Sequence, residues 1–299
     1  MRAQATCSRR AARRHWLAVA SASLLVLLLQ ADGLRLQAQE PATVRWRSGM
    51  ISLELPAAVM NDASLCRWLD RTVTAISEVL TVEPRPLAIR LFTDRLAYHA
   101  HAKRHVLGYT PAMDFCYYPA ERRIYGYLTD PERLQPRLRH ELVHALVHGS
   151  RIDGMPLWLE EGLAELMEGF AFDADGTWRL QQVQQQRLQQ VRRALSVGWR
   201  PDPDELAALD HEDFYGGHDG ASYSAAYGLA LLLHHDRGLM KALQGERVLI
   251  DQERFRRFIG EPEVWHQGLP DPAPLASAAG RREPTASSWI LQIRAIGNH

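Results

Sequence analysis

The feature that most constrains this chain is the run His140-Glu141-Leu142-Val143-His144. It lies in an amphipathic pattern that predicts a helix over residues 131–148. In such a helix, positions four apart are separated by about 40° around the axis, so both imidazoles share one face. They can hold a small cation together, and imidazole is a preferred ligand of zinc. Glu141 lies beside that cation, where its carboxylate could take a proton from water.

A second acidic run supplies what two histidines lack. Zinc in a catalytic site has three protein ligands as a rule, and the third is often a carboxylate. The run Trp158-Leu159-Glu160-Glu161-Gly162 follows on a predicted helix that Pro156 opens. Glu160 and Glu161 are both candidates for the third ligand, and we choose Glu161.

Together these residues resemble the gluzincin metallopeptidases, and within them the peptidase MA-like group, with aminopeptidase N and thermolysin as distant relatives. The resemblance rests on the two helices just described. It implies a Zn²⁺ cofactor with His140, His144 and Glu161 as ligands, and Glu141 as the general base. It also implies that Glu165, one turn after Glu161, hydrogen-bonds a ligand histidine.

The resemblance further implies a tyrosine that donates a hydrogen bond to the oxyanion formed when water attacks a carbonyl. Residues 222–235 predict the helix that would carry it. Tyr223 is the better match by order and spacing, and Tyr227, one turn later, is the next. A packed aromatic side chain whose hydroxyl finds any partner is the alternative.

Two other interpretations of the histidines are open to test against the sequence. A surface helix whose histidines bind nothing would show the same spacing, but it would not need the second acidic helix. The metzincin pattern requires glycine and histidine three and six residues after His144, where this chain has Val147 and Ser150. The sequence therefore favours the gluzincin interpretation over both.

The first 38 residues predict a targeting segment. Five arginines up to Arg14 precede an apolar run over residues 16–29, and Leu36-Gln37-Ala38 offers a cleavage site. An apolar run of about 14 residues is short for a membrane-spanning helix, so a cleaved signal peptide is favoured over an anchor. We expect an exported protein, periplasmic or extracellular, with a membrane contact only if the segment stays uncleaved.

Charge and cysteine content limit the partners and the redox state. Removing residues 1–38 takes away six arginines and one aspartate, so 35 basic and 35 acidic residues become 29 and 34. No basic stripe is visible along the mature sequence, which argues against a nucleic-acid partner. Export would permit a disulfide between Cys66 and Cys116, and a bridge and two buried thiols both remain open.

The order of predicted elements indicates an α+β fold. The patterns predict, in order, a strand or hairpin (44–55), a helix (62–80), a strand (87–92), a helix from Asp94, paired strands (112–118 and 123–128), the two motif helices, a polar lid-like helix (178–197) and a loop-rich stretch (201–220). His99, His101 and His105 lack a carboxylate in register, so we interpret them as a solvated helix face.

The gluzincin resemblance implies a zincin-like arrangement of these elements. It predicts an N-terminal lobe with a small mixed sheet and helices, an active-site helix and a helical C-terminal lobe. The expected segments are a signal peptide (1–38), the N-terminal α/β lobe (39–130), the zinc-site helices with the helical lobe (131–260) and a low-complexity tail (261–299). The strand just before the zinc helix would border the cleft and pair with an extended peptide.

The predicted function is that of an exported zinc-dependent peptidase that acts on a peptide or protein. An endopeptidase is favoured, because no Gly-x-Met-Glu-Asn-like stretch is present to hold a free amine. The alternative is a binding or scaffold protein of the cell envelope, built on the same fold with lapsed chemistry.

Overall fold

The computed structural model describes residues 43–57, 63–150, 155–216, 220–243, 250–261 and Trp265. The predicted signal peptide and nearly all of the predicted tail lie outside these residues. The chain divides into two compact units, Met1–Thr43 and Val44–His299, and the description below concerns the second. Among the described helices, none has both the length and the apolar character needed to cross a membrane.

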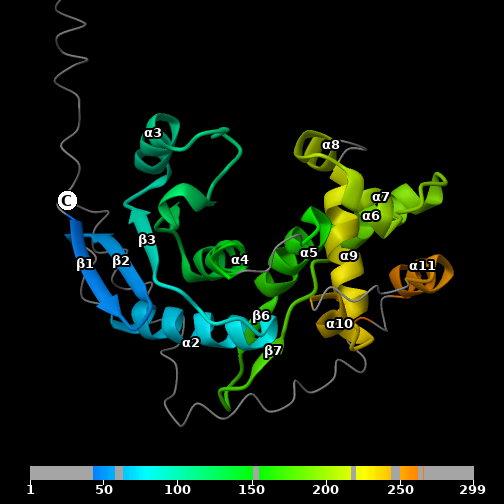
Figure 1. Ribbon diagram of the computed structural model, residues 1–299, viewed down its shortest axis with the longest axis horizontal. Helices are drawn as coiled ribbons and strands as arrows, with labels where there is room; N and C mark the ends of the chain where they lie inside the picture. Colours follow the sequence, from blue (N-terminus) through cyan, green and yellow to red (C-terminus); the bar gives the residue numbers. More distant parts are fainter. Residues whose placement is uncertain are drawn as a thin grey trace, which may run out of the picture. The chain divides into compact units, whose positions relative to one another are not determined.

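Seven strands and a series of helices make up the described part (Figure 1). The strands are β1 (Thr43–Ser48), β2 (Ile51–Pro56), β3 (Leu87–Phe92), β4 (Cys116–Tyr118), β5 (Arg123–Tyr127), β6 (Phe170–Phe172) and β7 (Trp178–Leu180). The helices are α2 (Ala63–Leu80), α3 (Arg95–His105), α4 (Pro131–Gly149), α5 (Leu157–Glu168), α6 (Gln185–Ser196), α7 (Pro203–Ala208), α8 (His211–Gly216), α9 (Ala221–His235), α10 (Leu239–Leu243) and α11 (Gln252–Gly260), with a short 3₁₀ helix, η2 (Pro119–Glu121).

The larger sheet has the strand order β1-β2-β3-β5-β4 and is mixed. Strands β2, β3 and β5 run parallel, whereas β4 pairs antiparallel with β5. Of the strand or hairpin predicted over residues 44–55, the structure shows the hairpin, in which β1 and β2 turn at Gly49 with φ +48°. That left-handed conformation favours glycine, which has no Cβ to clash.

The two faces of this sheet are covered differently. Side chains alternate between faces along a strand, and Leu53, Ile89 and Ile124 point into the main hydrophobic core with α2 and α4. On the other face, Phe92 and Tyr125 form a smaller cluster with residues of α3. The main core continues from the sheet through the helices as far as Trp265, so residues 39–130 and 131–260 share it.

The helical part is built on close contacts between α4, α5 and α9. Helix α5 lies between the other two in the view of Figure 1 and packs against both. A Cβ placed on Gly162 of α5 would lie 2.3 Å from the carbonyl oxygen of Ala226 in α9, so only glycine permits this approach of the two backbones. The position of α5, and of its acidic side chains, therefore depends on α9.

Two predictions about the region after α5 are wrong. Residues 178–197 were expected to form one polar helix, but Trp178 begins strand β7, which pairs with β6, and α6 starts only at Gln185. Helix α6 is not a lid, since Leu188 and Val191 are fully buried. The helix is rich in glutamine and arginine, so its narrow apolar stripe is hard to recognise in the sequence. That stripe is sufficient for packing. The loop-rich stretch contains helices α7 and α8.

Other expectations are settled by the sheet and its neighbours. The strand just before α4 is β5, which lies inside the sheet, so the strand at that edge of the sheet is β4. Cys66 and Cys116 are both buried and free. The predicted solvated face of α3 is only partly correct, because His101 is buried and stacks with His105. In class the structure is mixed α and β with a small mixed sheet, which is compatible with the expected α+β fold.

Candidate metal centre

Helix α4 lies close to its predicted limits, and its N-terminus is capped by a side chain. Asp130 accepts a hydrogen bond from the backbone N–H of Arg133 at 3.1 Å, and Pro131 occupies the first turn. The helix therefore carries His140, Glu141 and His144 into the protein, where His140 and Glu141 are each only 8% exposed. Polar groups this buried need partners, since water cannot satisfy them.

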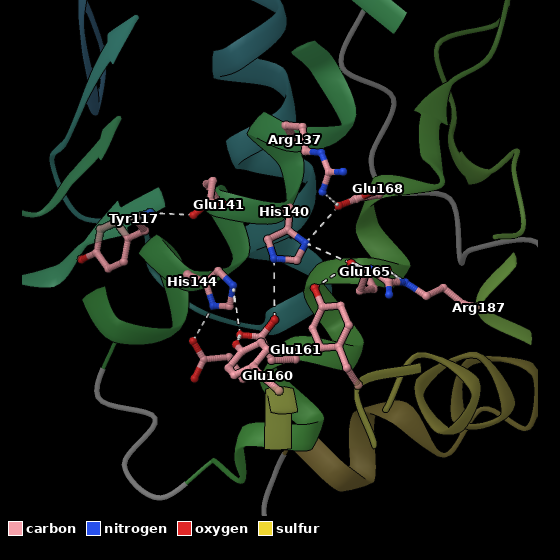
Figure 2. A network of polar contacts seen from close by, with 12 residues as sticks. Tyr117, Arg137, His140, Glu141, His144, Glu160, Glu161, Glu165, Glu168 and Arg187 are labelled. Atoms are coloured by element: carbon pink, nitrogen blue, oxygen red, sulfur yellow. Dashed lines mark hydrogen bonds and ion pairs between the residues drawn. The ribbon is translucent and has the colours of Figure 1, made fainter. Parts of the chain in front are cut away.

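Helix α5 brings Glu161 to the same point (Figure 2). Its Oε2 lies 3.7 Å from His140 Nε2, and its Oε1 lies 3.6 Å from His144 Nε2. One ligand atom from each of the three residues falls within 4.8 Å of the other two. The structure thus brings together the three residues for which the sequence predicts zinc ligation.

These distances suit a shared ion better than direct hydrogen bonds. A hydrogen bond between nitrogen and oxygen is about 2.7–3.2 Å long, so 3.6 and 3.7 Å are too long. Ligands at about 2.0–2.2 Å from a tetrahedral zinc lie roughly 3.3–3.6 Å from one another. Two imidazole nitrogens and a carboxylate are also the donor types that zinc takes in catalytic sites.

The remaining ring nitrogen of each histidine faces its own carboxylate. His144 Nδ1 lies 2.7 Å from Glu160 Oε1, and His140 Nδ1 lies 3.1 Å from Glu168 Oε1. The hydrogen bond to Glu160 can hold a proton on His144 Nδ1, which leaves the Nε2 lone pair free for a metal and fixes the orientation of the ring. At His140 the contact with Glu168 is an ion pair, which favours a proton on the same nitrogen. Glu160, the rejected candidate for third ligand, therefore orients His144.

The partner expected for a ligand histidine was Glu165, and in the structure its hydrogen bonds go elsewhere. Glu165 Oε1 is 3.9 Å from His140 Nδ1, too long for a hydrogen bond. Its oxygens instead accept hydrogen bonds from Arg187, at 2.9 and 3.1 Å, and from the hydroxyl of Tyr223, at 2.7 Å. Glu168 lies on the same face of α5 almost one turn later, and it takes the place next to His140.

Negative charge exceeds fixed positive charge around the three donors. Five glutamates and two arginines form the network: Glu141, Glu160, Glu161, Glu165, Glu168, Arg137 and Arg187 (Figure 2). Burial disfavours a charged His140, but Glu168, Glu141 and Glu161 outweigh it and raise the pKa of His140 to about 9. Burial likewise opposes charge on His144, while Glu161 and Glu160 raise its pKa. The site therefore attracts positive charge, as protons or as a metal cation.

Glu141 faces the edge strand of the sheet. One of its oxygens accepts a hydrogen bond of 2.6 Å from the backbone N–H of Tyr117 in β4 (Figure 2). Burial raises the pKa of Glu141, which makes the carboxylate a stronger base than an exposed one. The same side chain thus connects the histidine pair to the strand along which an extended chain could bind.

The tyrosines are arranged differently from the expectation. The hydroxyl of Tyr223 donates a hydrogen bond to Glu165 Oε1, which lies 3.9 Å from His140 Nδ1. Tyr227 accepts a hydrogen bond from the backbone of Gln184 at 2.9 Å, in a packing role. The tyrosine at the donor group is Tyr215 of α8, whose hydroxyl donates to Glu161 Oε1.

Sequence reasoning missed Glu168 and Tyr215 for different reasons. Glu168 was detectable, because it lies seven residues after Glu161 and positions i and i+7 share a helix face. Tyr215 sits on a helix of six residues within a stretch read as loop. So short a helix has no readable period, and the sequence gives no signal for its approach to Glu161.

The fold and the site thus define a mixed α and β protein with a buried group of two histidines and a glutamate that could hold a metal ion. Residues 137–244 match the model of a protein family described as being of unknown function, DUF1570. The matched span includes the three candidate ligands, Glu141 and the tyrosines Tyr215, Tyr223 and Tyr227. No curated protein matches the sequence.

Proposed function

We propose that this protein is an exported zinc-dependent peptidase with a zincin-like fold of the gluzincin type. The observation that carries the proposal is the convergence of His140 Nε2, His144 Nε2 and a Glu161 oxygen at one buried point. The two helical motifs also resemble those of gluzincins. This similarity of sequence is a separate observation that supports the same conclusion.

The three donors would hold the zinc ion, with Glu168 and Glu160 orienting the imidazoles. When bound, zinc supplies a Lewis acid for the scissile carbonyl and lowers the pKa of water. Glu141 would accept the proton of the attacking water and pass it to the leaving amine, a role that its raised pKa favours. For this, its side chain must turn a carboxylate oxygen from Tyr117 towards the donors.

Tyr215 is the better choice for the oxyanion donor. Its hydroxyl already contacts the candidate ligand Glu161, whereas the hydroxyl of Tyr223 donates to Glu165 instead. Tyr215 is also 39% exposed, as expected for a side chain on the substrate side of a site. A donor there would stabilise the negative charge that develops on the carbonyl oxygen.

Strand β4 supports the choice of a peptide as substrate. In the part of the chain that the structure describes, β4 pairs only with β5, which leaves its other edge for an added strand. Its Tyr117 N–H reaches Glu141, so a peptide lying along this edge would pass the proposed base. Backbone hydrogen bonds would then provide affinity without reading the peptide sequence.

The experiment that tests the proposal measures metal content and hydrolysis together. We expect one zinc per chain by elemental analysis, and chelator-sensitive cleavage of a proteome-derived peptide library. Glu141→Gln should retain the zinc and abolish cleavage, because an amide of the same size cannot accept the proton. The matched control is Glu132→Gln, an exposed change on the same helix, which should leave both unchanged.

Two results would go against the proposal. Loss of zinc in Glu141→Gln would make Glu141 a ligand and overturn the assigned roles. Zinc binding without cleavage of any peptide in the library would favour the scaffold alternative, in which the fold and the metal remain and the chemistry has lapsed.

A further inference from the structure

The open part of the large sheet carries a cavity lined by arginines. Strand register places Glu54 beside Arg90 and Ala88 beside Arg123, so these side chains share the face opposite Leu53 and Ile89. Helix α3 covers this face only around Phe92 and Tyr125. The remainder of the face, with β1 alongside, forms a cavity of about 540 Å³.

We name this cavity the basic groove after the residues that line it. Its charged lining residues are Arg45, Arg47, Arg122, Arg123, Glu54 and Glu121. Four arginines minus two glutamates leave a formal charge of +2, in a chain that is mildly acidic once residues 1–38 are removed. Arg45 and Arg47 lie two positions apart on β1, and side chains at that spacing point to the same face.

Glu54 is outnumbered by the arginines that face it. It is only 6% exposed, and its carboxylate lies 2.9 Å from Arg45 Nε, 3.4 Å from Arg123 NH1 and 3.9 Å from Arg90 Nε. One negative charge thus meets three positive ones. The second glutamate, Glu121, accepts a hydrogen bond from the hydroxyl of Tyr125, which leaves it less able to pair with arginine.

An unsatisfied group marks the groove as incomplete. Arg123 Nε is buried and has no hydrogen-bond partner among the described residues, and the nearest carboxylate oxygen, on Glu121, is 3.8 Å away. A buried donor without an acceptor is costly, so native structures usually supply one. The ion pairs of Glu54 account for the presence of Arg45, Arg90 and Arg123 on this face. They account neither for the unsatisfied Nε of Arg123 nor for Arg47.

We infer that the basic groove binds an oxyanion of the phosphate type, at a site separate from the metal centre. Guanidinium groups present paired N–H donors that match the oxygens of phosphate, and they remain charged at any physiological pH. The volume admits a phosphate with an attached organic group. A soluble phosphate ester and a phospholipid headgroup share this chemistry, and the site does not depend on the proposed peptidase activity.

The test is a titration of the purified protein with inorganic phosphate, followed by calorimetry, at low ionic strength. Arg45→Gln/Arg47→Gln removes two exposed arginines of the groove, and Arg67→Gln/Arg193→Gln removes two exposed arginines elsewhere. Both variants lose the same charge. We expect saturable binding in the wild type and in the control pair, and affinity lower by on the order of tenfold in the groove variant.

A second arm identifies the source of the phosphate group. Sedimentation with phosphatidylglycerol vesicles, against phosphatidylcholine vesicles, measures attachment to an anionic lipid surface. Groove-dependent binding of either probe supports the inference, and the probe bound more tightly indicates a solute or a membrane. Equal binding by the groove variant and the control variant would overturn it, as would no binding of either probe. Phosphate held by a metal at the other site would give that equal result.

Discussion

A single histidine links the two halves of the acidic network. His140 Nε2 faces Glu161 and its Nδ1 faces Glu168, at 3.7 and 3.1 Å. A proton or a cation at Nε2 changes the charge of the His140 ring, which lies next to Glu168. Glu168 in turn pairs with Arg137. A metal bound at the candidate site would therefore compete with protons for the same imidazole, and the balance between them would depend on pH.

This competition predicts opposite pH profiles for the metal-free and metal-loaded protein. The pKa of His140, about 9 in the folded metal-free protein, is above the value of about 6.5 in an unfolded chain. Its charge thus stabilises the fold fully below about pH 6.5, and this contribution is lost as pH rises through 9. We therefore expect the Tm of chelator-treated protein to decrease as the pH is raised from about 6.5 to about 9.

Zinc should reverse the trend, because a metal requires deprotonated imidazoles and its affinity grows with pH. The increase in Tm that zinc produces should therefore be larger at pH 9 than at pH 6.5, as measured by scanning calorimetry with and without zinc. An increase that does not change with pH would show that His140 and His144 are not the ligands.

The two tyrosines provide another test at the scale of single atoms. Tyr215→Phe should lower kcat about a hundredfold with little change in KM, if its hydroxyl acts on the oxyanion. Tyr223→Phe, the matched change, removes a hydrogen bond to Glu165 and should lower stability by about 1 kcal/mol while kcat stays within a few-fold. Steady-state kinetics on both variants decide between them, and the reverse pattern would restore the sequence-based choice of Tyr223.

At the scale of elements, the packing of α5 on α9 predicts the effect of a single methyl group. Gly162→Ala would place Cβ 2.3 Å from the carbonyl oxygen of Ala226 and 3.1 Å from the Cβ of Ala230. Backbone cannot yield as a flexible side chain does, so we expect a loss of about 1–3 kcal/mol. Because Gly162 follows Glu161 directly, zinc affinity should fall as well.

The control for this substitution is Gly260→Ala at the end of α11, where an added Cβ meets no atom within 4 Å. Its stability in urea should stay within about 0.5 kcal/mol of the wild type, since it is a surface change. If Gly162→Ala is equally neutral, then α5 and α9 have room to separate, and the close approach is not what positions Glu161.

The elements that could be predicted from sequence are those long enough to show a period. Helices α4 and α9 and strand β3 were found close to their limits, because apolar side chains recur at helical or strand spacing or form a buried run. Strands β6 and β7 have three residues each, too few for a period to be seen. For the same reason the sequence indicated His140, His144 and Glu161, which the structure brings together, but not Tyr215.

At the scale of the whole molecule, charge is organised in space more than along the chain. The sequence shows no basic stripe, yet the sheet brings Arg45 and Arg47 of β1 to the cavity that Arg123 of β5 also lines. Parallel pairing joins strands that are distant in the sequence, so a local scan of charge cannot detect such a group. A lack of contiguous basic charge argues against a nucleic-acid partner, but it is compatible with a compact anion site.

The hydrogen bonds that hold Glu165 can form only late in synthesis. Its partners Arg187 and Tyr223 follow 22 and 58 positions later in the chain, and α9 must be present before α5 has its neighbour. The chain is synthesised from its N-terminus, so α4 and α5 with all the candidate ligands are made first. Helices α6 and α9, which supply Arg187 and Tyr223, follow later. The candidate metal centre is therefore completed late, and a chain that bound an ion there would do so only after most of its length had been synthesised.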